Sequence, residues 1–310
     1  MLKYVLKRIV MIIPVVLAVS FIVFFIMDFV PSDPAVTVLG DGATEQQIEY
    51  YRETHGLNDP LPVRYVRYMA GIAKGDLGTS YAQNRPVWDI FFEKFPNTFK
   101  LAIASVIVTV LLSIPLGILA AVKNNTWIDT ICSTLSFVGL AMPNFWLGLL
   151  LIILFSVNLH WLPSTGAVGF KSLILPAITC GTGNMAALTR ITRSSMLEVI
   201  RQDYIRTAKA KGAMRWAVIL KHALKNAMIP IVTLVGTDFG YMLTGSMLIE
   251  KVFSIPGIGK LAVDAMSNRD LPLLEGTVMY IAFVFVVVNL IVDVSYAFLD
   301  PRIRYGKGAA

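Results

Sequence analysis

The sequence has few charged residues. Of its 310 residues, 15% are Asp, Glu, Lys or Arg and 56% are hydrophobic, whereas soluble globular chains carry about 25% charged residues. This composition excludes an ordinary soluble domain and predicts a polytopic membrane protein. The net charge of +7 falls in loops between apolar runs, as is typical of cytoplasmic loops. No aromatic residues are interleaved with the basic ones as a platform for single strands, so we expect no nucleic-acid binding.

Residues that bind metals or carry out redox chemistry are also scarce. The chain has 2 cysteines and 3 histidines. Cys132 and Cys180 both fall within apolar runs, and two isolated cysteines make neither a disulfide framework nor a zinc site. The histidines show no ligand spacing. We therefore expect no metal site and no cofactor in this chain.

Nucleotide-binding motifs are absent in their proper context. The stretch 257–262 fits G-x-G-x-x-A, but no strand is predicted before it. The stretch 166–172 ends in Lys-Ser but has Phe170 where a phosphate-binding loop needs glycine. The chain is therefore not expected to be an enzyme, and any ATP hydrolysis must come from another subunit.

Apolar runs divide the rest of the chain and predict an all-α fold with six transmembrane helices. The fourth run contains Pro176 and several Gly, Thr and Asn residues, which suit packing against other helices or a wet cavity better than lipid. The predicted spans are 9–27, 101–122, 131–157, 173–189, 227–249 and 278–299.

The distribution of Lys and Arg predicts the orientation. Between residues 190 and 225 they far outnumber Asp and Glu, and six spans with the N-terminus inside place this loop and both termini in the cytoplasm. We predict four segments: the N-terminus with the first helix (1–30), an external loop (31–98), a five-helix core (99–300) that includes the basic loop 196–226, and a cytoplasmic tail (301–310). The first run is too long for a signal peptide and lacks a cleavage site.

The external loop carries three helix signals. A capping box from Thr44 to Gln47 opens one helix that Gly56 closes. Pro62 opens a second, which ends near Gly75, and Pro86 opens a third over 87–95. A structural lid and a contact surface for an external protein are both consistent with these signals.

The basic loop is amphipathic. Tyr204, Ile205 and Ala208 fall on one side of a helix, and Arg201, Arg206 and Lys209 fall on the other. Gly212 ends this helix because glycine readily adopts left-handed backbone angles, and a second short helix follows over 214–224. The pattern fits either a helix lying on anionic lipid or a docking element for a soluble partner.

The sequence from Arg206 to Gly212, RTAKAKG, resembles the signature of permease subunits of binding-protein-dependent ABC importers. Ala208 and Gly212 match the general EAA-x-x-x-G pattern. Arg206 and Thr207 depart from it in the manner of the dipeptide, oligopeptide and nickel branch. Further blocks at 1–9, 55–81, 236–261, 268–272 and 289–306 are similar to that branch, so the resemblance covers nearly the whole chain.

This resemblance implies a type I ABC importer permease in a bacterial or archaeal cytoplasmic membrane. It further implies a heterodimer with a homologous second permease, two cytoplasmic ATPase subunits that bind ATP and Mg, an external substrate-binding protein and a small-peptide substrate. The basic loop corresponds to the coupling helix, which inserts into a groove on the ATPase. The residues assigned to this coupling are Tyr204, Ile205, Arg206, Ala208, Lys209, Lys211 and Gly212.

Polar and small residues in the spans are candidates for the transport pathway. A proline bends a helix and frees carbonyl groups, and here Pro143 stands beside a polar Asn. A buried acid is costly in a membrane and is commonly functional. The pathway candidates are Met142, Pro143, Asn144, Asn184, Asp238, Thr244 and Ser246, and the glycines expected to allow close helix packing are Gly236, Gly240 and Gly245.

Other functions remain open at this stage. Within the same family the substrate could be nickel or a metal chelate, since no His or Cys cluster decides the matter. From a different class, the chain could be an ion-coupled secondary transporter that uses Asp238. A receptor or scaffold without transport activity is the third alternative.

Overall fold

The computed structural model describes residues 2–28, 33–40, 42–166 and 169–299. In these ranges the chain is helical, as predicted, and extended pairing is confined to an isolated bridge between Thr79 and Pro86. The predicted tail 301–310 lies outside the described residues. The helices are α1 (Leu2–Asp28), α2 (Pro34–Leu39), α3 (Glu45–Thr54), α4 (Leu61–Ala73), α5 (Val87–Val122), α6 (Trp127–Ala141), α7 (Asn144–Leu151), α8 (Phe170–Ile200), α9 (Asp203–Ala210), α10 (Arg215–Ala217), α11 (Lys225–Leu243), α12 (Met247–Val252), α13 (Ile258–Ser267) and α14 (Leu271–Leu299), with π-helical segments η1 (Ile152–Asn158) and η2 (Val218–Leu224).

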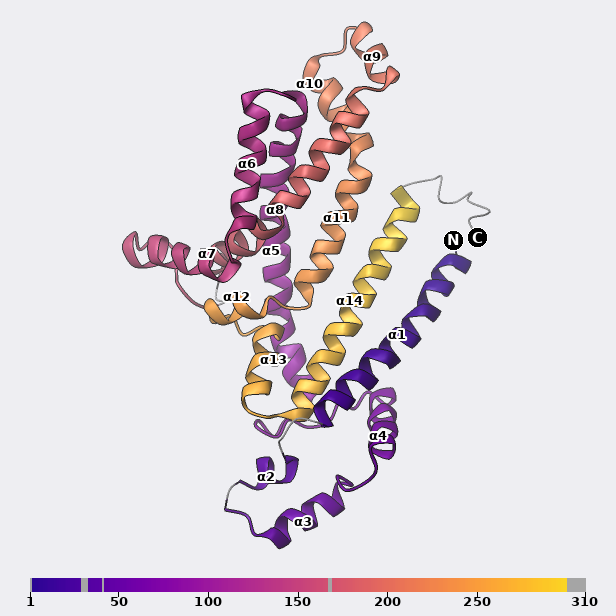
Figure 1. Cartoon of the computed structure of the whole chain (residues 1–310), viewed down its shortest axis with the longest axis vertical. Coiled ribbons are helices and arrows are strands. Elements are labelled where there is room, and N and C mark those ends of the chain that lie inside the picture. The colour runs from indigo at the N-terminus through magenta and orange to yellow at the C-terminus, as the bar shows by residue number, and fades with distance from the viewer. Residues whose placement is uncertain (1, 29–32, 41, 167–168, 300–310) are drawn as a thin grey trace.

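The long helices form an elongated bundle (Figure 1). The six predicted spans correspond to α1, α5, α6 with α7, α8, α11 and α14. Three helical runs in the described residues are individually long and apolar enough to cross a membrane, and α6 with α7 and η1 passes the same test as a bent pair. The three runs are Val87–Val122, Arg215–Leu243 and Leu271–Ile291.

Helix α8 is the least apolar of these spans, and it packs closely on α5. The Thr109 hydroxyl donates to the carbonyl of Gly181 at 3.0 Å, and the Ser113 hydroxyl donates to that of Met185 at 3.2 Å. An added Cβ at Gly181 would lie 2.9 Å from the Ser105 carbonyl oxygen. The polar and small residues predicted for the fourth span therefore serve close packing against α5.

The two ends of the bundle differ. Figure 1 shows α2, α3 and α4 at one end and α9 with α10 at the other. We call the described residues between 33 and 86 the cap, and residues 196–226 the basic segment.

The third helix of the predicted external loop begins at Val87 after Pro86, as predicted, but it does not end at residue 95, because it continues without a break as α5. Ile90 and Phe91 are fully buried and pack with residues of α13 and α14. This packing offsets the hydrogen bond that Pro96 removes from the helix interior. The predicted boundary between residues 98 and 99 consequently falls within a continuous helix.

Two other spans differ in shape from the prediction. The third, 131–157, is not straight: Pro143 lacks an N–H and holds Met142 in an extended conformation, and the helices on either side are bent by 96°. The fifth ends at Leu243 rather than at residue 249. Gly245 interrupts it with φ of +92°, a left-handed conformation, and the chain turns into α12.

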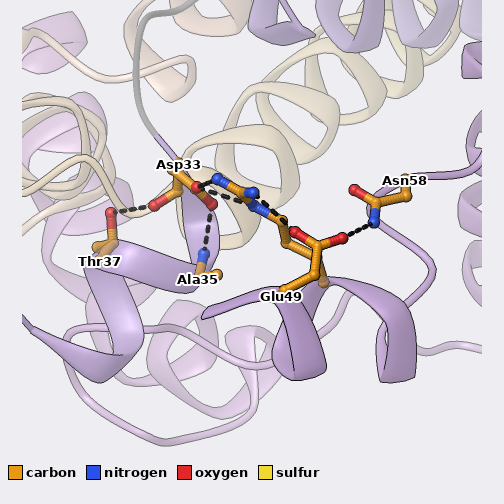
Figure 2. A network of polar contacts seen from close by, with 6 residues as sticks. Asp33, Ala35, Thr37, Glu49 and Asn58 are labelled. Carbon is orange, nitrogen blue, oxygen red and sulfur yellow. Dashed lines mark hydrogen bonds and ion pairs between the residues drawn. The ribbon is translucent and has the colours of Figure 1, made fainter. Parts of the chain in front are cut away.

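Charged side chains of the cap pair with one another. Its α3 begins with the predicted capping box, in which Thr44 N–H donates to Gln47 Oε1 at 2.9 Å. Helix α2 was not predicted. It starts at Asp33, whose Oδ1 accepts the Ala35 N–H at 2.9 Å. Arg52 of α3 donates from Nε to Asp33 Oδ2 at 3.0 Å, which joins the two helices (Figure 2).

These contacts set the charge state of Asp33. Although burial opposes the effect, the hydrogen bonds from Arg52 and from the Ala35 N–H hold the pKa of Asp33 below its ordinary value. Arg52 also contacts Glu49 at 3.0 Å, and Glu49 in turn accepts from Asn58 at 2.7 Å. Asp33 therefore stays ionised at neutral pH, and its contacts join α2 to α3.

The cap is tied to the bundle by buried and half-buried acids. Asp270, which is buried, accepts the Ser80 hydroxyl, the N–H groups of Tyr81 and Ala82 at 3.1 Å each, and the Leu273 N–H at 3.3 Å. At the end of α1, Asp28 pairs with Arg64 of α4 at 2.6 Å. The loop after α4, the start of α14 and the end of α1 are thus held together.

Candidate functional site

A cavity of about 400 Å³ opens between α7, α8, α11 and α12. Figure 1 places α7 and α12 side by side, roughly halfway between the two ends of the bundle. Four predicted pathway residues line this cavity together with apolar side chains such as Met242 and Ile281: they are Asn144, Asn184, Thr244 and Ser246. Residues that are far apart in the sequence therefore meet at a mid-bundle site with amide and hydroxyl groups.

Two helix breaks create this cavity. The bend at Pro143 directs α7 out of the line of α6 and places Asn144 at the start of α7. The turn at Gly245 brings residues 244–248 of the broken fifth span to the opposite wall. An added Cβ at Gly245 would lie 2.6 Å from the Gly259 nitrogen, so the turn accommodates only glycine.

Hydrogen bonds to α5 and α13 hold α12, which forms one wall of the cavity. Glu250 is fully buried, and its carboxylate accepts the Thr98 hydroxyl at 2.7 Å and the Lys260 N–H at 2.9 Å. The Thr98 oxygen also accepts the Ile258 N–H at 2.8 Å. An added Cβ at Gly257 would lie 2.4 Å from the Glu250 carboxyl carbon. The block of similarity at 236–261 thus forms a small folded unit that fixes one side of the cavity.

Three pathway candidates lie outside the cavity lining. Met142 and Pro143 form the bend itself. Asp238 lies on α11, is half-buried, and its Oδ2 has no hydrogen-bond partner among the described residues. The cavity lining includes Tyr241, one helical turn further along, which the sequence reading did not select.

The predicted packing glycines differ in what they contact. An added Cβ at Gly240 would lie 2.9 Å from Val288 Cγ1 of α14, so this glycine permits close approach of two helices. Gly245 serves the turn against Gly259 instead. Gly236, the third of the set, is half-buried on α11.

The basic segment forms a second candidate site. It begins at the end of α8 and continues through α9, α10 and η2. The Tyr204 side chain is 45% exposed, whereas Ile205 is 0% exposed and packs with Met196, Val218 and Ile231 of this chain's own core. We predicted that both side chains lie on a face that contacts the ATPase. Instead, Ile205 and the half-buried Ala208 anchor α9 to the bundle.

Two exposed apolar residues of this segment were missed by the sequence reading. Met214 is 78% exposed and Trp216 is 65% exposed. They follow Gly212, where the chain turns with φ of +76°, as the glycine predicted. The sequence signal that could have identified this surface is Trp216, a large aromatic residue that directly follows Arg215.

The positive charges of the basic segment have few partners. Arg206 pairs only loosely with Asp203, at 3.8 Å with both side chains largely exposed. Among the described residues, no ion pair or side-chain hydrogen bond is formed by Lys209, Lys211 or Arg215. This end therefore combines free cations with exposed Tyr, Met and Trp side chains, a composition common in interaction surfaces.

An ion pair near the basic segment links α6 to α8. Arg193 donates from Nε and Nη2 to the two oxygens of Asp129, both at 2.7 Å, and from Nη2 to Asn124 at 2.8 Å. The Asn125 N–H also donates to Asp129 Oδ2, at 3.0 Å. A displacement of α8 at this end would therefore be transmitted to α6, which leads to the bend at Pro143.

Two family models match this chain, and together they cover most of its length. Residues 113–305 match the family described as the binding-protein-dependent transport system inner membrane component. Residues 1–102 match the N-terminal part of binding-protein-dependent transport system membrane components.

Individual proteins are similar too. The glutathione transport system permease protein GsiC of Salmonella paratyphi A is 44% identical over 305 residues, which cover 98% of this chain and 100% of that protein. The Escherichia coli protein of the same name is 42% identical with the same coverage. Two structures of the MetNI methionine ABC transporter in inward-facing conformations share the fold, with TM-scores of 0.57 and 0.58 at 15% identity, over 68% and 67% of this chain and 96% and 95% of theirs.

Proposed function

Because this chain belongs to the family of binding-protein-dependent transport system inner membrane components, it is a permease subunit of an ABC importer, and we propose that it carries small peptides of the size of glutathione. The family membership makes it a transport component in a membrane. The finer statements on substrate, orientation and partners below are proposals.

The observation that carries the proposed substrate is the mid-bundle cavity. A peptide presents amide and carboxylate groups, and the cavity supplies side-chain amides from Asn144 and Asn184 and hydroxyls from Thr244 and Ser246. Its volume of about 400 Å³ falls in the range of about 300–1,000 Å³ usual for small-molecule sites. The names of the GsiC relatives, which are about as long as this chain, point to a peptide-like substrate as well.

We assign the cap to the external side and the basic segment to the cytoplasm. The excess of Lys and Arg in the basic segment supports this orientation through the positive-inside rule. An ATPase subunit would contact the exposed residues of the basic segment, chiefly Tyr204, Met214 and Trp216, with the unpaired cations around them. A homologous second permease, a second ATPase and an external binding protein would complete the importer.

The packing of the basic segment supports the proposed coupling. Ile205 fixes α9 to Val218 of η2 and Met196 of α8, so a movement of α9 would also displace α8. The pair of Arg193 and Asp129 would carry this movement to α6. Closure of the ATPases would in this way alter the cavity at the end of α6.

Uptake by the complete importer in proteoliposomes tests the proposed substrate. Labelled glutathione and a labelled dipeptide are supplied with the binding protein outside and ATP inside. We expect ATP-dependent uptake of a peptide, and at least a tenfold loss in Asn184→Leu because an apolar wall no longer pairs with substrate amides.

Asn289→Leu provides the matched control. Asn289 lies on α14 outside the cavity lining, and its hydrogen bond within the described part of the chain goes to Phe285 of its own helix, so uptake should stay near the wild-type level. Equal losses in the two variants, or ATP-dependent uptake of nickel with no uptake of peptide, would contradict the proposal.

A further inference from the structure

A second cavity, of about 370 Å³, lies directly beneath α9. Its walls come from the end of α5, the end of α8, α9 and η2. Most of the lining is apolar, and Lys209 and Arg215 are its two charged residues: the other members are Ala121, Val122, Ile200, Ile205, Ala213, Val218, Ile219 and Ala223. Such a cavity suits an amphiphile with an apolar part and a negative head.

The apolar part of the cavity is formed by the chain's own core. Ile205 and Ala223 are fully buried, and Val218 and Ile219 are nearly so. These side chains face one another across α9 and η2 in a single apolar cluster. An apolar group that enters the cavity leaves water, which is favourable at about 25 cal/mol per Å² of apolar surface buried.

The two charged residues at the cavity have no ionic partner in the part of the chain that the structure describes. Neither Lys209 nor Arg215 forms an ion pair or a side-chain hydrogen bond among the described residues. Asp203, the acid on α9, contacts Arg206 rather than either of them. A phosphate placed between Lys209 and Arg215 would meet two cations that have no competing carboxylate.

The depth of this cavity in the membrane indicates that its ligand is a membrane lipid. Between Lys100 and Lys123, α5 carries no charged residue, and this run is long enough to cross the hydrocarbon core of roughly 30 Å. Ala121 and Val122 end the run, so the cavity lies where hydrocarbon gives way to lipid headgroups. Trp127, which follows this run closely in the sequence, is strongly exposed, as is typical of aromatic residues at this boundary.

We propose that the cavity beneath α9 binds one anionic phospholipid, with the phosphate between Lys209 and Arg215 and an acyl chain among the apolar side chains of α5, α9 and η2. The lipid would act as a wedge between the end of α5 and α9 and would thereby set the angle at which α9 meets its partner. The proposal depends on the membrane position of α5 and not on the identity of the transported substrate.

Native mass spectrometry of the complete importer tests this site. The complex is released from nanodiscs of phosphatidylcholine that contain a minor fraction of phosphatidylglycerol, and the phosphatidylglycerol retained is counted. We expect one tightly held molecule per copy of this chain. The double variant Lys209→Gln/Arg215→Gln should bind it roughly 30-fold more weakly, from about a tenfold change per 1.4 kcal/mol and about 1 kcal/mol for each cation near an anionic surface.

Two comparisons separate a built site from general attraction to lipid. Lys221→Gln/Lys225→Gln removes the same charge from exposed residues that do not line the cavity, and it should retain the lipid. Ala213→Phe keeps both cations but fills the cavity, and it should lose the lipid. Thermal melting and recovery of the assembled complex exclude misfolding, and if Ala213→Phe fails there, the smaller Ala213→Leu takes its place as the cavity-filling variant.

Three results would overturn the proposal. Equal retention by wild type and the cavity-filling variant would indicate only annular lipid. Equal weakening by both double charge variants would indicate a diffuse electrostatic effect. If lipid is bound by the permease pair but absent from the complete importer, a side chain of the ATPase occupies the cavity in the assembled complex. Peptide transport could fail in every case without affecting these outcomes, since the readout is bound lipid.

Discussion

The two ends of this permease treat charge in opposite ways. In the cap, Arg52, Arg64 and Arg67 are each paired with a carboxylate, at Asp33, Asp28 and Asp59 respectively. In the basic segment, Lys209, Lys211 and Arg215 have no such partner among the described residues. Exposed apolar side chains accompany the free cations there, at Met214 and Trp216.

This difference separates two uses of charged residues. Paired charges at the cap connect short helices that contribute little to a buried core: no residue of α3 or α4 is buried. Unpaired charges at the basic segment contribute little to folding, because buried Ile205 and Val218 already hold α9 in place. They are available to another molecule. Changes at the cap should therefore alter stability, and changes at the basic segment should alter association.

The largest effect is expected where the cap joins the bundle. Asp270→Ala removes the acceptor for Ser80, Tyr81 and Leu273 and leaves buried donors unsatisfied, at about 1–3 kcal/mol each. We expect a loss of roughly 3 kcal/mol, measured as a fall of several degrees in the melting temperature in detergent. Asp264→Ala is the control, because its pair with Lys260 is only half-buried and its loss should cost less than about 1 kcal/mol. Equal effects would refute the role of Asp270.

At the basic segment, charge reversal should weaken association and leave the fold intact. Arg206→Glu and Lys211→Glu change exposed residues without a strong partner in this chain. We expect each to weaken binding of the ATPase on the order of tenfold, with an unchanged melting temperature. Pull-down of the ATPase at several salt concentrations gives the measurement. Lys74→Glu in the cap should not weaken it, and if it did, the distinction between the two ends would be lost.

Arg52→Ala tests a paired charge of the cap. The half-buried pair of Arg52 and Asp33 contributes about 1 kcal/mol, so amide exchange in α2 and α3 should be moderately faster at neutral pH. The pKa of Asp33 is lowered from 3.8 in the fold. Its stabilising contribution is therefore complete above this value and disappears as pH falls through the lowered pKa. The difference between variant and wild type should be constant above about pH 5 and shrink below pH 4; growth of the difference in acid would contradict it.

The smallest effects come from two equivalent glycines. Gly212 in the basic segment and Gly75 in the cap have φ of +76° and +82°, and neither has any atom within 4 Å of an added Cβ. Alanine at either position costs about 1 kcal/mol of local strain. Gly212→Ala should also raise the ATP hydrolysed per peptide imported, because α9 would be held at a different angle, whereas Gly75→Ala should not. The same ratio in both variants would show that Gly212 has no part in coupling.

Local signals in the sequence predicted the helix ends well. The capping box at Thr44, the left-handed Gly212 and the break at Pro143 follow from the properties of one or two residues, so a short stretch is sufficient to identify them. The 96° bend at Pro143 was not predictable, because its size depends on what α7 packs against.

Long-range contacts explain what the sequence did not reveal. The amphipathic pattern of α9 identified Ile205 as a residue of its apolar face, but it could not show that this chain's own η2 covers that residue. The exposed Trp216 lies outside α9 and therefore outside that pattern. Asn144 and Asn184 were selected separately, and their meeting at one cavity follows from the breaks at Pro143 and Gly245. The burial of Glu250 likewise depends on Thr98, which lies far away in the sequence.

Site-specific photo-crosslinking in the native membrane tests the opposite character of the two ends most directly. A benzophenone amino acid replaces Tyr204 on α9 or Val66 on α4, both of which are exposed. We predict that the probe at position 204 captures an ATPase subunit with a phosphate-binding loop and that the probe at position 66 does not. Capture of the ATPase from position 66, or its absence from position 204 in an active importer, would contradict the assignment of the basic segment as the docking site.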